Sequence, residues 1–363
     1  MKALTIGGAM IDTIAIIESD RIERVSMLNA ETSFLLLEEG RKTESTEVST
    51  HCGGGAINSA VAMARLGVSA ATLVKLGNDD RADMILARLA HEGISPQWIK
   101  RDATAPTGAS VHVSSHERNA AVFTFRGANT GLKLEDLDAD AFAVDLVYVS
   151  NLSQGSADCY PAIIANAKAN GALLAINPGM RQLSGRAGEF VSSLRDVDIL
   201  AINRQEAETL IPVLAGKFAK FEPELTPTKD GPQPPLLARG LIGGGYQMSL
   251  PAFMSALRRL GTRYVVLTDS RAGAFVHKEG ELLYCPALQT PVAGTAGAGD
   301  AFAATFAAYL ALGNPCTTAL KAATVNAASV VAHVDTQTGL MRQPQIDAAL
   351  AAGNGPDQRR WLL

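Results

Sequence analysis

Aromatic residues and cysteines are both scarce in this sequence. Phe, Trp and Tyr make up 5% of the 363 residues, and the only cysteines are Cys52, Cys159, Cys285 and Cys316. They lie far apart, without a Cys-x-x-Cys pair or a histidine at metal-ligand spacing. This excludes a disulfide scaffold and is typical of reduced thiols in the cytoplasm. The formal net charge is -4, so the chain has no excess of basic residues with which to attract nucleic acids or anionic membranes.

A long unbroken hydrophobic run is also missing. The longest uncharged run, residues 301–320, contains Gly313, Asn314 and Pro315, which interrupt a helix. Asp12 interrupts the apolar start of the chain, and no small-residue cleavage site follows it, so the pattern predicts no signal peptide. We therefore expect a soluble, cytoplasmic protein whose partners are neither nucleic acids nor membranes.

Short apolar runs alternate with helical stretches over the middle of the chain. Runs of the parallel-strand type lie at 145–150, 172–177, 197–203 and 263–270. This alternation predicts an α/β fold, a doubly wound and mostly parallel central sheet with helices on both faces, in a single domain over residues 1–363.

Two early segments do not follow this alternation. Residues 12–50 and 107–126 are rich in β-like runs, and the second segment predicts a hairpin around "HERN". We expect these segments to form a small β-sheet lid over one end of the main domain. Residues 217–247 are rich in Pro and Gly and too long for an ordinary connection. They are either a functional surface insertion or a mobile loop.

The stretch "GTAGAGDAF", residues 294–302, comes directly before a predicted helix. The first turn of a helix has unpaired N–H groups and a partial positive charge, and glycines there let a phosphate approach closely. Asp300 beside such an anion site suits a base for phosphoryl transfer, although it could also simply cap the helix. No GxxxxGK[ST] sequence occurs, and Gly297 and Gly299 do not continue into a GxGxxG fingerprint.

Two motifs in this order resemble the signatures of the ribokinase-like (PfkB) carbohydrate kinases. Residues 53–67, "GGGAINSAVAMARLG", look like the first signature, and "GAGDAF" at 297–302 looks like the second. Shorter stretches between them are similar to other motifs of the family: "GGAMID" (7–12), "RGANTGL" (126–132), "INPGMRQL" (176–183), "INRQEAETL" (202–210) and "VVLTDSRAG" (265–273). The resemblance covers nearly the whole chain outside residues 217–247.

The resemblance implies a role for each matching residue. Asp300 is implied as the catalytic base, with an anion hole formed by Gly297, Ala298 and Gly299. The residues implied to hold the sugar are Asp12, Gly53, Gly54, Asn58 and Asn129. Two of these have simpler readings, since Asn58 could cap a helix and Asn129 could belong to a hairpin turn.

A second group of residues is implied at the nucleotide. Its members are Asn203, Glu206, Thr268, Ser270, Gly273 and Asn326, with Asn326 beside the adenine. Glu206 is implied to bind Mg²⁺ through water, because Mg²⁺ keeps much of its hydration shell. The Asn-x-x-Glu spacing is also that of an ordinary helix start.

The sequence departs from the family pattern at two positions. Gly294 stands where an Asp often helps to bind a monovalent cation, which argues against a potassium site. Ser270 replaces the first glycine of the nucleotide turn.

The resemblance implies a kinase that depends on ATP and Mg²⁺. Its acceptor is implied to be a hydroxyl, of the hydroxymethyl type, in a small-molecule sugar. It also implies a homodimer formed through the lid. A nucleoside kinase is the alternative within this class, although so few aromatic residues favour a plain sugar. A catalytically silent sugar or nucleotide sensor is the alternative of another class, but its base and anion hole would be expected to be lost.

Overall fold

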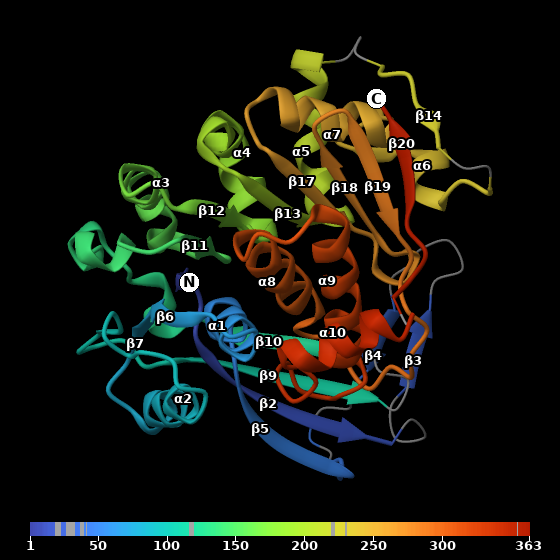
Figure 1. Ribbon diagram of the computed structural model, residues 1–363. Helices are drawn as coiled ribbons and strands as arrows, with labels where there is room; N and C mark the ends of the chain where they lie inside the picture. Colours follow the sequence, from blue (N-terminus) through green and yellow to red (C-terminus); the bar gives the residue numbers. More distant parts are fainter. Residues whose placement is uncertain are drawn as a thin grey trace.

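The computed structural model describes residues 1–18, 23–26, 33–36, 40, 42–115, 120–218, 222–228, 231–353 and 355–363. A large central sheet runs through this part of the chain (Figure 1). In spatial order its strands are β14 (Thr226–Pro227), β20 (Arg359–Leu362), β19 (Glu281–Cys285), β18 (Ala274–Lys278), β17 (Tyr264–Thr268), β13 (Ile199–Asn203), β12 (Leu173–Ile176), β11 (Leu146–Val149), β1 (Lys2–Ile6) and β6 (Ser69–Leu73).

The strands from β6 to β17 pair in parallel, and those from β17 to β14 pair antiparallel. Parallel strands are buried on both faces, which explains their continuous apolar runs. In β1, for example, Leu4 and Ile6 face one buried cluster while Ala3 faces the other. The predicted fold class, doubly wound and mostly parallel, is confirmed.

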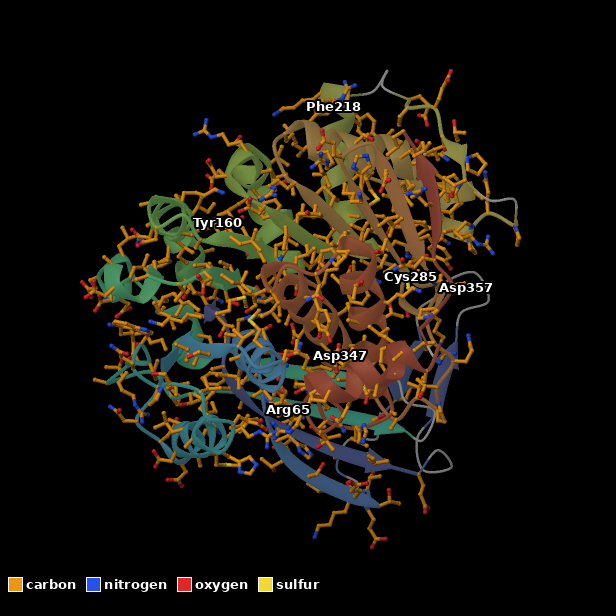
Figure 2. All side chains as sticks on the ribbon, viewed as in Figure 1. Arg65, Tyr160, Phe218, Cys285, Asp347 and Asp357 are labelled. Carbon is orange, nitrogen blue, oxygen red and sulfur yellow. The ribbon has the colours of Figure 1, made fainter. Side chains whose placement is uncertain are left out.

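Helices cover both faces of this sheet. One face packs against α3 (Tyr160–Ala169), α4 (Met180–Ser193), α5 (Arg204–Phe218), α6 (Pro235–Arg239) and α7 (Leu250–Arg259). The other packs against α1 (Gly55–Arg65), α2 (Asp80–His91), α8 (Ala298–Ala311), α9 (Cys316–Val331) and α10 (Gln343–Ala351). Side chains occupy the layers between sheet and helices (Figure 2), where Tyr160 stacks on Phe190 with ring centroids 5.8 Å apart.

A separate four-stranded sheet lies at the bottom of the view in Figure 1. Its order is β10 (Ala120–Phe125), β9 (Gly108–Ser115), β2 (Met10–Ile17) and β5 (Glu47–Gly53). β9 and β10 form the antiparallel hairpin predicted around "HERN", and residues 116–119 themselves lie outside the described residues. Two-stranded pairs form between β3 (Glu23–Ser26) and β4 (Ser33–Leu36), and between β7 (Lys75–Leu76) and β8 (Lys100–Arg101). The rest of residues 19–41, Gly40 apart, also lies outside the description.

The described part of residues 217–247 packs onto the main domain. Leu236 and Leu241 are buried in the core, and β15 (Leu241–Gly243) pairs with β16 (Tyr246–Met248) beside α5. Gly243 lies so close to α5 that a methyl group on it would be 1.9 Å from the Glu208 carbonyl oxygen. The leucines of residues 235–247 belong to the buried core, and whether residues 217–247 act as a functional insertion or a mobile loop stays a prediction.

Candidate active site

The glycine-rich turn begins α8, as its sequence predicted. Gly297 is the N-cap residue, with φ of 78°, and a methyl group there would be 2.6 Å from Cβ of Thr336. Both facts require glycine at this position. The N–H groups of Ala298, Gly299 and Asp300 donate no hydrogen bond to any described residue. Unpaired N–H groups in the first turn of a helix can hold an anion, as predicted for this turn.

Asp300 lies in this first turn and contacts the first glycine-rich helix. Asn58 Nδ2 of α1 donates a hydrogen bond of 2.8 Å to Asp300 Oδ2, across 242 residues of sequence. Burial raises the pKa of the Asp300 carboxyl, the hydrogen bond from Asn58 lowers it, and the negative charge of Asp12 raises it again. The net effect is a pKa above the ordinary value, which makes Asp300 a stronger base than an exposed aspartate.

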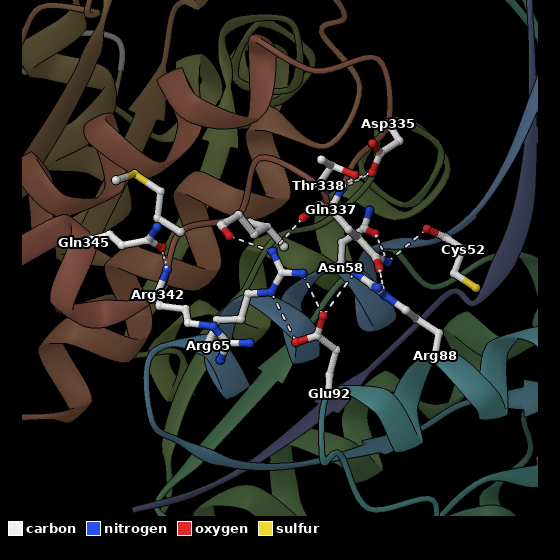
Figure 3. A network of polar contacts seen from close by, with 12 residues as sticks. Cys52, Asn58, Arg65, Arg88, Glu92, Asp335, Gln337, Thr338, Arg342 and Gln345 are labelled. Atoms are coloured by element: carbon white, nitrogen blue, oxygen red, sulfur yellow. Dashed lines mark hydrogen bonds and ion pairs between the residues drawn. The ribbon is translucent and has the colours of Figure 1, made fainter.

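Asn58 is held in place by residues that the sequence analysis did not identify. Its Oδ1 accepts hydrogen bonds from Thr336 Oγ1 at 2.9 Å and from Gln337 Nε2 at 3.0 Å. Figure 3 shows Gln337 next to Asn58, with Arg88 donating to Gln337 Oε1 at 2.9 Å. With both ends of its amide bonded, Asn58 keeps its NH₂ group directed at Asp300. The prediction did not include Thr336 and Gln337 because they follow α9 in a loop without a recognisable motif.

An ion-pair network supports the same region. Arg65 donates to Glu92 through Nε and Nη2, at 3.2 and 2.7 Å, and to the carbonyl oxygen of Gln337 at 2.8 Å (Figure 3). The bond to Gln337 ties the loop after α9 to α1, which carries both Asn58 and Arg65.

Asp12 lies on β2 of the small sheet, opposite Ser110 of β9. Ser110 Oγ donates to Asp12 Oδ1 at 2.5 Å and also lies 2.8 Å from His112 Nε2. The Asp12 carboxylate is buried, and a methyl group on Gly53 would lie 1.9 Å from its Oδ2. Glycine at position 53 therefore leaves the room that this carboxylate occupies.

Gly54 allows the chain to approach the end of β1. Its φ is 94°, and a methyl group there would be 2.5 Å from the carbonyl oxygen of Gly8. A methyl group on Gly55 would contact both Ser150 Oγ, at 2.8 Å, and Asp300 Oδ1, at 3.4 Å. The glycine triplet thus brings α1, the end of β11 and the first turn of α8 together.

Asn203 and Glu206 form a reciprocal cap at the start of α5. Glu206 N donates to Asn203 Oδ1, and Asn203 N donates to Glu206 Oε2, both at 2.9 Å. The structure thus contains the ordinary helix start that the spacing allowed. The pair also lines a cavity of about 190 Å³ that includes Asp300 and Gly299. Burial raises the pKa of Glu206 to about 7, and the charge of Asp300 adds to this effect.

A larger cavity of about 580 Å³ lies beside the first, and Asn203, Thr268, Gly299 and Phe302 line both. Two more of the predicted nucleotide residues, Ser270 and Gly273, line the larger cavity. Ser270 has φ of 50°, so it adopts the left-handed conformation that favours the glycine of the family pattern.

Asn326 does not lie at this cavity, so its predicted position beside an adenine is wrong. It is fully buried between helices, where its Nδ2 donates to Thr305 Oγ1 and its Oδ1 accepts from Met341 N. The cavity is lined instead by another face of α9, with Thr324, Ala327 and Val331. A helix turns by about 100° per residue, so neighbouring positions face different surroundings.

Asn129 uses both ends of its amide to hold one backbone unit. Its Oδ1 accepts from Ala9 N, and its Nδ2 donates to the Ala9 carbonyl oxygen, both at 2.8 Å. The side chain is buried and clamps the connection between β1 and β2. Direct contact of Asn129 with a sugar stays a prediction, and these two hydrogen bonds do not support it.

The comparison with family models gives the same result as the motifs. The model described as pfkB family carbohydrate kinase matches residues 11–217 and 250–343. The chain belongs to the pfkB family of carbohydrate kinases. The unmatched residues between the two segments, 218–249, nearly coincide with the Pro- and Gly-rich stretch. Membership makes this chain a carbohydrate kinase.

Relatives of known function match over most of the chain. It is 26% identical to the deoxyribokinase of Salmonella typhi over 330 residues, which cover 90% of this chain and 94% of the relative.

Two solved structures show the same fold. The Arabidopsis thaliana ribokinase complexed with ribose and ATP has a TM-score of 0.69 at 17% identity, covering 96% of this chain and 98% of that one. The nucleoside kinase of Methanocaldococcus jannaschii has a TM-score of 0.73 at 17% identity, covering 97% and 99%. In the described part of this chain, every helix is too short or too polar to cross a membrane.

Proposed function

We propose that this kinase transfers the γ-phosphoryl group of ATP to a hydroxyl of a sugar, of the hydroxymethyl type, with Asp300 as the general base. One observation carries the proposal: a partly buried carboxylate of raised pKa lies in the same helix turn as three open N–H groups. A base and an anion site next to each other are what phosphoryl transfer to a hydroxyl requires.

The reaction follows from these groups. Asp300 takes the proton of the sugar hydroxyl as its oxygen forms a bond to the γ-phosphorus. The bond between that phosphorus and the bridging oxygen breaks, and ADP leaves. The N–H groups of Ala298, Gly299 and Asp300 stabilise the negative charge of the transferring group. Asn58 orients the carboxylate through its 2.8 Å hydrogen bond.

The two cavities suit ATP and Mg²⁺. The larger one combines apolar side chains such as Leu288 and Val331 with the polar Thr268 and Ser270, which suits a nucleoside. Among the described residues, no cluster of three His, Cys, Asp or Glu side chains could hold a metal alone. Glu206 would therefore hold Mg²⁺ through water, with phosphate oxygens completing the coordination. Bound Mg²⁺ neutralises charge on the phosphates. Gly294 has no side chain to bind a monovalent cation, so we propose no potassium site there.

Asp12 and the second N–H of the Asn58 amide would bind sugar hydroxyls, beside the backbone of Gly53 and Gly54. The small sheet, from about residues 12–50 and 107–126, would close over the sugar as a lid and exclude water. A cavity of about 550 Å³ between this sheet and residues 293–296 is lined by Ile14, Val122, His112 and their neighbours, without Phe, Trp or Tyr. A sugar therefore fits better than a nucleoside, whose base needs a flat apolar wall.

The nucleoside alternative remains the second candidate because the chain resembles a solved nucleoside kinase as closely as a ribokinase. All four cysteines are free thiols, in keeping with a cytoplasmic enzyme. A silent sensor is disfavoured, since the base and the open helix turn are both present.

The test is Asp300→Asn, assayed against pentoses, hexoses and nucleosides with ATP. The amide cannot accept the proton, so we expect kcat to fall roughly 10²–10⁴-fold while sugar binding persists. Asp83→Asn, an exposed change on α2, is the control for loss of one charge. Full activity of Asp300→Asn would exclude this residue as the base. If the unmodified chain phosphorylates only nucleosides, the second candidate replaces the first.

A further inference from the structure

Two arginines line a cavity that the proposed reaction does not use. Arg126 follows β10 of the small sheet, and Arg181 lies in the first turn of α4, beyond the end of β12. Together with Thr124, Thr130 and Gln154 they line a cavity of about 470 Å³. Arg126 follows a strand of the small sheet and Arg181 follows a strand of the main sheet, and both side chains line this one cavity.

The positive charges in this cavity lack a counter-charge among the described residues. Neither Arg126 nor Arg181 forms an ion pair there, whereas Arg186 on the same helix pairs with Asp158. Arg126 is half-buried and donates to Ser153 Oγ at 2.6 Å. Burial lowers the pKa of Arg126, and the neighbouring Arg181 charge lowers it further. Arg181 is exposed, and two guanidinium groups that line one cavity favour a bound anion.

A strained residue lies in the same cavity. Gln154 has φ of 50°, a conformation that non-glycine residues rarely adopt. Strain of this kind is retained where the surrounding structure imposes it, and it is often found at ligand sites.

Two links lead from this cavity toward the proposed sugar site. On the small sheet, Val122 of β10 lines both this cavity and the one between the small sheet and residues 293–296. On the main sheet, the loop after β11 links the two places: Ser150 packs against Gly55 beside Asp300, and Ser153 binds Arg126. Asn151 packs against Gly179, just before α4 and Arg181. A sugar whose hydroxyl faces Asp300 can therefore extend toward the arginines.

We propose that the sugar substrate carries an anionic group, a carboxylate or a phosphate, and that Arg126 and Arg181 bind this group at the end remote from the phosphorylated hydroxyl. The inference rests on the proposed function, because it extends the same substrate site. Carboxylates and phosphates both present a pair of acceptor oxygens that a guanidinium binds with two hydrogen bonds. The structure assigns both arginines to substrate selection and leaves the proton transfer to Asp300.

The experiment compares three forms of each pentose and hexose as acceptors: the neutral sugar, its aldonate and its phosphate ester. We expect one anionic form to have the highest kcat/KM, and its identity distinguishes carboxylate from phosphate. Arg181→Gln should lower kcat/KM for that form by about 10- to 100-fold and leave neutral sugars unchanged, because only charged hydrogen bonds are lost. Arg126→Lys keeps the positive charge but loses the paired N–H donors of the guanidinium. It should lower kcat/KM for the anionic form by about tenfold.

Arg186→Gln is the matched control, since it removes an arginine of α4 that does not line the cavity. A preference for neutral sugars, or an equal effect of Arg181→Gln on neutral and anionic forms, would overturn the inference while leaving the kinase function intact. Calorimetry without ATP gives an independent readout. Binding of an anionic sugar that is lost in Arg181→Gln supports the site even without turnover, and no binding of any anionic sugar overturns it.

Discussion

At the scale of single residues, the proposed site depends on two carboxylates with different neighbours, the partly buried Asp300 and the buried Glu206. Asp300 accepts a hydrogen bond from an amide, and Glu206 accepts one from a backbone N–H of its own helix cap. Burial raises the pKa of both carboxyls, and their charges are close enough for Asp300 to raise the pKa of Glu206. The ionisation of Asp300 should therefore affect turnover, and that of Glu206 should affect stability, each with its own pH dependence.

The pH dependence of turnover reports the ionisation of Asp300. The base must be ionised. As the pH is lowered, kcat should therefore begin to fall at a pH above the pKa of an ordinary aspartate. Asn58→Ala removes the donor that lowers this pKa, so the acid limb should move to higher pH, in addition to a lower maximum rate. Asn170→Ala, an exposed change outside the site, is the control. A pH–rate profile that is unchanged in Asn58→Ala contradicts the assignment.

Glu206→Gln should stabilise the protein at pH 8. The pKa of Glu206 is raised from 4.5 to about 7 in the folded chain, so its contribution to stability is present below pH 4.5 and is lost as pH rises through 7. Gln keeps the helix cap without the buried charge. We expect a gain of about 1–3 kcal/mol in unfolding free energy at pH 8 and little at pH 5, without Mg²⁺.

Denaturant titrations at the two pH values measure this difference, with Glu189→Gln as an exposed control on α4. Equal changes at pH 5 and pH 8 would show that the Glu206 charge is not the cause. Turnover of Glu206→Gln should fall despite the greater stability, because the proposed Mg²⁺ contact is weakened.

At the scale of elements, two glycines at the start of α8 have different roles: the fold requires one, and the other is proposed to serve binding. Gly297 needs glycine for its left-handed φ of 78° and its contact with Thr336. Gly299, two residues later, has no atom within 4 Å of the position of a methyl group. Glycine at position 299 is therefore not required for packing, and an empty space before an anion site suits a phosphoryl group.

A pair of alanine substitutions tests this distinction. Gly297→Ala should destabilise the protein by about 1–3 kcal/mol, through strain and overlap. Gly299→Ala should be neutral or stabilising by up to about 1 kcal/mol, because alanine favours a helix. It should nevertheless lower kcat/KM for ATP by more than tenfold, because its methyl group fills the phosphoryl site. Thermal unfolding and steady-state kinetics measure the two effects, and a fully active Gly299→Ala contradicts the assignment.

At the scale of the whole molecule, the small sheet has exposed apolar side chains at its edges. Val48 on β5 is 64% exposed, and Phe123 and Phe125 on β10 are 59% and 52% exposed. Edge strands with such residues are suited to pairing with another chain. We therefore propose a homodimer formed through the small sheets.

Phe123→Asp should convert this dimer to a monomer, because a charge in an apolar interface is left without a partner. Leu134→Asp, at a residue 62% exposed but outside the small sheet, should leave the dimer intact. Sedimentation equilibrium measures the mass of both variants. A monomeric unmodified chain, or an equal effect of the two substitutions, contradicts an interface at this sheet.

Local sequence determined those features whose physical cause lies within a few residues. The alternation of apolar runs predicted the sheet and its class, and the glycines before an apolar stretch predicted the start of α8. The cap of α5 follows from Asn203 and Glu206, three positions apart. These features depend on backbone conformation and helix geometry, which short stretches specify.

Only the tertiary structure decided which distant residues meet. Asn58 contacts Asp300 across 242 residues, and Gln337 contacts Asn58 across 279. The same packing binds Asn129 to Ala9, buries Asn326 away from the cavity of about 580 Å³, and places Arg126 and Arg181 at one cavity. No local pattern predicts such pairs, because they depend on how the helices and both sheets pack, and one turn of a helix decides which cavity a side chain faces.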